Sequence, residues 1–120
     1  MEIEKVNLKE KFELINKYWS PGIAGKLNGQ HVKLAKIKGE FIWHKHDLED
    51  ELFLVIEGVL KIALENKVLE LHEGEFVIIP KGVRHKPIAD EEVRLLLFEP
   101  ESTVNTGEKE NEFTFTPYFI

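Results

Sequence analysis

Residues 7–18 carry hydrophobic side chains three or four positions apart, which is the spacing of one face of an α-helix. The stripe is formed by Leu8, Phe12 and Ile15. Asn7 is a suitable N-cap residue, and Glu10 occupies the capping-box position three residues later. Pro21 and Gly22 disfavour continuation of a helix. The pattern therefore predicts one short N-terminal helix over residues 7–18.

Beyond residue 30 the hydrophobic and polar positions alternate with the period of β-strands. Turn signals such as Gly58 and the polar residues 65–67 separate the hydrophobic runs. Regularly spaced short strands indicate an all-β fold, an antiparallel sandwich or a barrel. The expected strands are 31–37, 40–46, 51–56, 59–64, 68–71, 76–79 and 93–98.

Composition narrows the class of protein further. The chain has 120 residues, 42% of them hydrophobic, which is enough for one compact domain over residues 1–120. Without cysteine it forms no disulfide, which fits a cytoplasmic location. The net charge of −6 argues against binding of nucleic acid. Neither a signal-peptide core nor a membrane-spanning run is evident, so we expect no membrane association.

Three histidines and one glutamate form the candidate chemical site. His44 and His46 are two residues apart in an expected strand, so both imidazoles should point to the same face. Glu51 begins the next strand, and His85 follows later. Three imidazoles and a carboxylate form a ligand set for one divalent transition metal: iron, manganese, nickel, zinc or copper. A His-x-His pair alone is a weak signal, since it also describes two solvated histidines.

The spacing around these residues is more specific. Residues 39–58 read glycine, four residues, His-x-His, four residues, glutamate, six residues, glycine. Residues 74–85 read glycine, five residues, Pro-x-Gly, two residues, histidine. The two blocks together resemble the sequence motifs of the cupin superfamily, and the resemblance covers roughly residues 32–99. One residue is missing before the first histidine, and Ala89 replaces an asparagine of the second motif.

The resemblance implies a double-stranded β-helix, or jelly-roll barrel, with a metal held inside its mouth by His44, His46, Glu51 and His85. It points to small single-domain cupins often labelled mannose-6-phosphate-isomerase-like, and to a homodimer. Asp50 is an alternative carboxylate, but the six-residue gap to Gly58 favours Glu51. The segment Ile3 to Val6 and the apolar tail 113–120 are the expected dimer contacts; the tail could instead dock on its own domain.

Other residues are expected around the metal. Phe53, Val55, Leu96 and Phe98 should line the cavity. Trp43 should lie outside it, His31 could reach its lip, and His72 should be exposed. The candidate cations for a phosphate are Lys33, Arg84, Lys86 and Arg94.

Three functions remain open on the sequence alone. The first is a metal-dependent isomerase acting on a small polar metabolite such as a sugar or sugar phosphate, with Glu99 or a lysine as the base. The second is an iron or manganese dioxygenase. The third is a binding module with a structural metal. A cluster of basic residues around the metal would favour the first function, a dry aromatic pocket the second, and a closed coordination shell the third.

Overall fold

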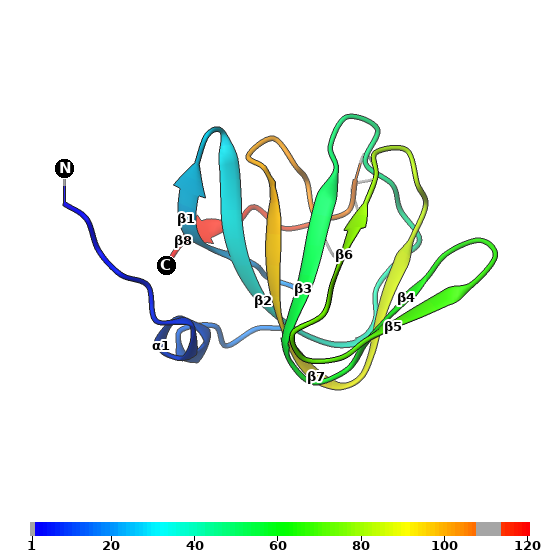
Figure 1. Cartoon of the computed structure of the whole chain (residues 1–120), viewed down its shortest axis with the longest axis horizontal. Coiled ribbons are helices and arrows are strands. Elements are labelled where there is room, and N and C mark those ends of the chain that lie inside the picture. Colours follow the sequence, from blue (N-terminus) through cyan, green and yellow to red (C-terminus); the bar gives the residue numbers. More distant parts are fainter. Residues whose placement is uncertain (1, 108–113) are drawn as a thin grey trace.

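The computed structural model describes residues 2–107 and 114–120, and these residues form one helix and eight strands (Figure 1). The elements are α1 (Leu8–Glu13), β1 (Gly22–Leu27), β2 (Gln30–Glu40), β3 (Glu51–Glu57), β4 (Leu60–Ala63), β5 (Val68–Leu71), β6 (Phe76–Ile79), β7 (Lys86–Pro100) and β8 (Tyr118–Phe119). The expected all-β fold with a short N-terminal helix is confirmed. The helix, at six residues, is too short to cross a membrane.

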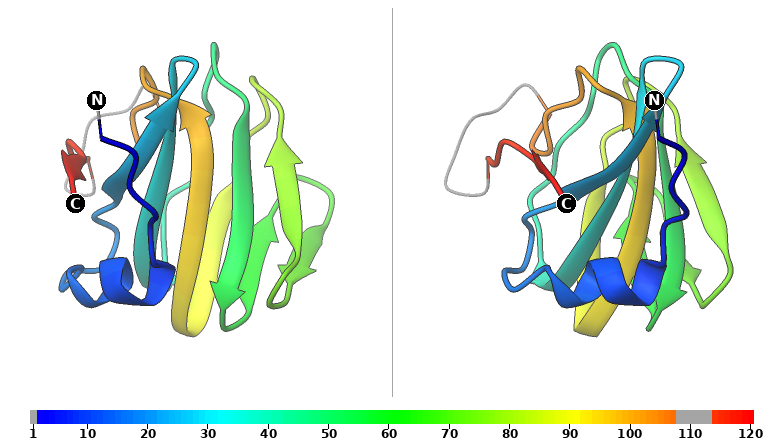
Figure 2. Two further views of the ribbon diagram at one scale, coloured as in Figure 1. Left: turned by 60° about the vertical axis from the view of Figure 1, so that its left-hand side comes forward. Right: turned by 90° about the vertical axis from the view of Figure 1, so that its left-hand side faces the viewer.

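The barrel is organised around β7, a strand of 15 residues that takes part in two layers. Its beginning pairs with β4, with Ile88 opposite Lys61. β2 pairs with β7 from Ile88 to Pro100, and β3 pairs with the later part of β7 on the other side. β6 extends the sheet beyond β3, and β5 extends it beyond β4. Because one long strand belongs to both layers, the sheet curls around a buried core (Figures 1 and 2).

The helix begins as predicted, since the Asn7 side chain accepts a hydrogen bond of 3.0 Å from the Glu10 amide. It ends at Glu13, so the prediction of a helix over 7–18 was wrong in its second half. The amides of residues 14 and 15 bond to carbonyls only three residues earlier, which tightens the last turn. Phe12 and Ile15 then pack on Leu34 of β2, and α1 lies across the lower end of the sheet (Figure 2).

The expected strand over 40–46 was also wrong. β2 ends at Glu40, and residues 41–46 meet residues 85–87 only at separate points. β7 begins at Lys86, earlier than the expected strand 93–98, and β1 was not expected. The polar residues 90–92 interrupt the hydrophobic pattern, so the first half of β7 was not predicted. β1 was not predicted because it contains two glycines, and glycine is a weak strand former.

Gly58 shows why glycine stands at the turns of this barrel. Its φ is +98°, and a Cβ atom placed there would lie 2.8 Å from the Glu92 carbonyl oxygen. The other motif glycines, Gly39, Gly74 and Gly82, also have positive φ, a backbone conformation that glycine adopts readily.

The C-terminal end of the tail docks on its own chain. Tyr118 and Phe119 form β8, which pairs in parallel with β1. The Ile120 amide bonds to the Ile23 carbonyl at 2.9 Å. The first residue of the expected tail, Phe113, lies outside the described residues. Ile3 and Phe119 remain 97% and 67% exposed, and the homodimer stays a prediction.

Candidate metal centre

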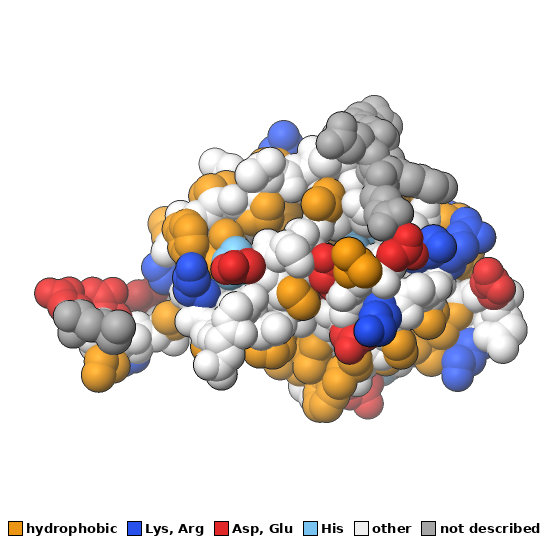
Figure 3. Space-filling model, turned by 90° about the horizontal axis from the view of Figure 1, so that it is seen from above, with side chains coloured by type: hydrophobic (Ala, Val, Ile, Leu, Met, Phe, Trp, Pro, Cys, Tyr) orange, Lys and Arg blue, Asp and Glu red, His pale blue; other side chains and the backbone are white. Residues whose placement is uncertain are grey.

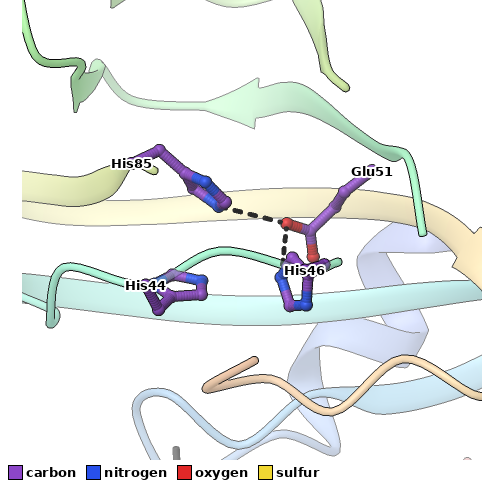
Figure 4. A group of neighbouring side chains, drawn as sticks. All are labelled: His44, His46, Glu51 and His85. Carbon is purple, nitrogen blue, oxygen red and sulfur yellow. Dashed lines mark ion pairs between the residues drawn. The ribbon is translucent and has the colours of Figure 1, made fainter. Parts of the chain in front are cut away.

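The four residues singled out by the sequence lie together inside the barrel (Figure 4). One nitrogen from each histidine and one oxygen from Glu51 all lie within 4.8 Å of one another. Glu51 Oε1 is 3.3 Å from His46 Nε2 and 3.5 Å from His85 Nε2. All four side chains are buried. Donor atoms this close together can all contact a single metal ion after small shifts of their side chains.

Local backbone pairing brings the four residues to one place. His44 and His85 form an isolated antiparallel bridge through two hydrogen bonds of 3.0 and 2.9 Å. The Gly82 amide donates to the His46 carbonyl at 2.7 Å. This hydrogen bond joins the ligand loop that carries His44 and His46 to the segment that precedes His85. Glu51 is the first residue of β3 and turns inward. Asp50 is exposed and accepts from the Lys81 amide at 2.9 Å, so it lies outside the cluster.

Hydrogen bonds orient two of the imidazoles. The Nδ1 atoms of His44 and His85 each lie 2.9 Å from a carbonyl two residues earlier, Ile42 and Val83 respectively. Each Nδ1 therefore carries the proton, and each Nε2 offers its lone pair to the centre. His46 Nε2, Glu51 Oε1 and His85 Nε2 are buried without a hydrogen-bond partner among the described residues. Orphaned buried acceptors are costly, and a metal ion would satisfy all of them.

The electrostatic environment keeps the donors in their metal-binding forms. Burial, reinforced by the neighbouring His85, lowers the pKa of His44 from 6.5 to about 4. Burial opposes ionisation of Glu51, but the close approach of the His46 and His85 imidazoles, at 3.3 and 3.5 Å, outweighs it and holds the pKa of that carboxyl below its ordinary value. At neutral pH the site therefore offers a neutral imidazole and a carboxylate, the forms that bind metals.

Comparison with known proteins now identifies the family. Residues 30–99, more than half of the chain, match the family model described as Cupin domain. The chain belongs to the cupin family. A crystal structure of a cupin-2 domain containing protein from Shewanella frigidimarina is 45% identical to it, with a TM-score of 0.78. That similarity covers 79% of this cupin and 93% of the Shewanella chain.

Two further proteins are similar to parts of the chain. The uncharacterized protein YdbB of Bacillus subtilis is 40% identical over 62 residues. The match covers 51% of this cupin and 55% of YdbB, so the chain spans about half the length of that curated relative. A putative sugar phosphate isomerase from Acidithiobacillus ferrooxidans is 25% identical, with a TM-score of 0.54. It covers 62% of this cupin, which in turn covers 51% of that chain.

The depressed pKa of His44 predicts a specific pH dependence of stability in the metal-free cupin. Below pH 6.5 the unfolded chain protonates His44 first, so the folded state loses stability as the pH falls from 6.5 towards 4. The free energy of unfolding should therefore fall by about 2 kcal/mol between pH 7 and pH 5. Urea unfolding of EDTA-treated protein should show that loss, and His44→Gln should lose about 2 kcal/mol less over the same range. Equal slopes for the two proteins would contradict the assignment.

A cavity adjoins the cluster, and two of the four candidate ligands, His44 and Glu51, face it. Its volume is about 50 Å³, counted as the space open to the centre of a water molecule, which holds roughly three to five waters. Most of its wall is apolar. The main apolar contributors are Trp19, Ile37, Phe41, Phe53, Leu95 and Leu97.

The expected wall was correct for Phe53 only. Val55 is fully buried in the core. Leu96 and Phe98 are not among the wall residues, and Leu96 packs on the helix side instead. Side chains alternate along a strand, and in β7 the odd-numbered positions 95, 97 and 99 face the cavity.

One of the four candidate cations reaches the cavity. Lys33 projects inward from β2 and lies 3.5 Å from the Glu99 carboxylate, the pair being 3% and 2% exposed. Burial and the charge of Glu51 raise the pKa of the Glu99 carboxyl well above its usual value, and Lys33 opposes that rise. Arg84 stacks on Trp43, which is not in the cavity wall, as expected. Lys86 and Arg94 form ion pairs with Glu40 and Glu57 respectively.

Nothing in the sequence indicated that two further residues, Trp19 and Asn105, would line the cavity. Trp19 has a φ of 60°, which turns the chain back, and its ring stacks on Phe41 at 4.7 Å. Asn105 comes from the polar segment after β7 and reaches the wall. His72 is exposed, as expected, and His31 is buried but does not line the cavity.

Proposed function

We propose that this cupin is a metal-dependent enzyme acting on a small, largely apolar molecule, with a dioxygenase-type oxidation as its reaction class. The observation that supports the proposal is the apolar, partly aromatic cavity that meets the candidate ligands at His44 and Glu51. An apolar wall keeps water from the metal and strengthens electrostatic interactions there.

The residues present fit such a metal. His44, His46, Glu51 and His85 would hold it, and four ligands leave one or two positions open on an octahedral ion. Bound iron(II) or manganese(II) would supply redox chemistry and coordination of substrate and dioxygen at those positions. The chain itself contributes the apolar wall, where Trp19 and Phe41 stack, and a polar end formed by Lys33 and Glu99.

A sugar phosphate isomerase is the second candidate. Lys33 in the cavity and the similarity to a putative sugar phosphate isomerase support it. The described cavity wall, however, offers a single basic residue and a small volume. Seen from above, basic side chains are scattered among acidic and hydrophobic ones (Figure 3). A phosphate ester is usually bound by several cations or amides, so the apolar substrate is favoured.

The first test is metal content by elemental mass spectrometry on protein purified without added metal or a histidine tag. About one ion of iron, manganese, nickel, zinc or copper per chain is expected in the wild type. His44→Ala should lose it, and the exposed His72→Ala should keep it. Absence of metal from all three proteins, even after titration, would contradict the proposal.

The second test asks whether the metal has an open position. Nitric oxide, added without oxygen to the iron(II)-loaded protein, should produce the electron paramagnetic resonance signal of an iron–nitrosyl centre. A silent sample would mean a closed coordination shell and would favour the binding module over any enzyme.

A further inference from the structure

We infer that the cavity selects a small carboxylate with an apolar body, whose carboxylate group is bound by Lys33. The inference rests on the proposed function, because a metal held by residues that line the same cavity as Lys33 would contribute to the attraction. It adds the chemical class of the ligand and names a residue outside the four candidate ligands as the one that recognises it.

Lys33 is almost completely buried. Its side chain is 3% exposed and enters a wall that also contains Ala35 and Ile37 of the same strand. A buried ammonium group destabilises the fold unless it is well paired, and apolar residues at such a position are often as stable or more stable. A lysine that extends into a cavity at that cost is better explained by a ligand than by packing.

The pairing of Lys33 is incomplete. Nζ lies 3.5 Å from Glu99 Oε2, whereas a hydrogen bond between ionised groups is typically about 2.7–2.9 Å long. Glu99 Oε2 has no hydrogen-bond partner among the described residues. Both groups line the cavity, so their unused hydrogen-bonding capacity is available to a molecule bound there.

The charge balance favours an anion. A divalent metal carries two positive charges, and Lys33 adds one. Glu51 and Glu99 remove at most two, and the histidine ligands are neutral when they bind metal. The loaded site therefore keeps at least one net positive charge in a largely apolar wall, where opposite charges attract strongly.

The size and lining of the cavity define the rest of the ligand. The volume of about 50 Å³ admits a small body, and the wall around Trp19, Phe41 and Leu97 is apolar. One ammonium group matches the single charge of a carboxylate, whereas a phosphate monoester carries nearly two charges and commonly binds several donors. The geometry therefore favours a small monocarboxylate over a phosphate.

The test uses zinc-loaded protein, which avoids redox reactions, and three probes: butanoate, its neutral analogue butanamide, and inorganic phosphate. Isothermal titration calorimetry should show butanoate binding at least about tenfold more tightly than butanamide. Lys33→Met should weaken butanoate binding by about tenfold or more and leave butanamide unchanged. The matched control is Lys38→Met, an exposed lysine on the same strand, which should behave as the wild type.

Zinc content, measured first for each variant, distinguishes failure of the proposed function from failure of this inference alone. Loss of zinc from the wild type would overturn both the proposed function and this inference. Bound zinc with equal affinity for butanoate and butanamide, or a preference that survives in Lys33→Met, would overturn the inference alone. Tighter binding of phosphate than of butanoate would assign the site to phosphate esters instead. If Lys33→Met does not fold, Lys33→Met/Glu99→Gln removes both charges and should abolish the carboxylate preference in the same way.

Discussion

Metal-free protein should unfold at a temperature roughly 10–20 °C below that of the metal-loaded protein. The reason is that the folded chain leaves His46 Nε2, Glu51 Oε1 and His85 Nε2 buried without partners. A ligand that binds only the folded state adds about 4 kcal/mol at a free concentration a thousand times its dissociation constant. Differential scanning calorimetry before and after EDTA treatment measures the difference.

Two variants make that expectation specific to the site. Glu51→Gln replaces the carboxylate among the four candidate ligands with a neutral group of the same shape, so metal should raise its unfolding temperature much less than that of the wild type. His72→Ala removes an exposed histidine and should respond to metal as the wild type does. Metal that stabilises Glu51→Gln as much as the wild type must act elsewhere on the chain, and the proposed centre would then be wrong.

The cluster of candidate ligands could be predicted because its information is local. His44 and His46 need only be two residues apart in extended chain, and the gap to Glu51 fits a turn. The prediction of a regular strand there was wrong, yet the rings still face the same way, because the isolated bridge to His85 keeps that segment extended. The spacing of the motifs was therefore a better guide than the secondary structure assigned to them.

The cavity wall could not be predicted, and β7 shows why. Leu95, Leu96, Leu97 and Phe98 are all apolar, so no alternation tells which pair faces inward. Both faces of this strand are covered: Leu95 belongs to the barrel core, and Leu96 packs against the cluster around α1. A strand buried on both sides loses the polar positions that would reveal its orientation. Only Glu99, expected in the site as a candidate base, indicated which positions of this strand face inward. Side chains two residues apart share a face, so an inward Glu99 places Leu95 and Leu97 inward as well.

The place of Trp19 in the cavity wall could not be predicted for a different reason. Its place in the wall depends on a positive φ and on a hydrogen bond from its indole to the Lys38 carbonyl at 3.0 Å. Neither is encoded by residue type within a short window, because tryptophan rarely adopts that backbone conformation. Such a residue is found only when the barrel against which it packs is known.

Gly107→Ala should destabilise the protein by about 2–3 kcal/mol and should speed loss of metal to a chelator. Gly107 has a φ of +70°, and a Cβ atom there would lie 2.1 Å from the carbonyl oxygen of Lys45, between two candidate ligands. The segment 103–107 also carries Asn105 of the cavity wall. An added methyl group must push this segment away from the ligand loop and open the cavity to water.

Gly29→Ala is the matched control, because Gly29 has a similar φ of +76° but no atom within 4 Å of the added Cβ. It should cost about 1 kcal/mol from backbone strain alone and leave the rate of metal loss unchanged. Urea unfolding measures the first quantity, and absorbance of a metal-binding dye measures the second. The difference between the two variants isolates the contact with Lys45, so equal effects would show that segment 103–107 does not hold the ligand loop in place.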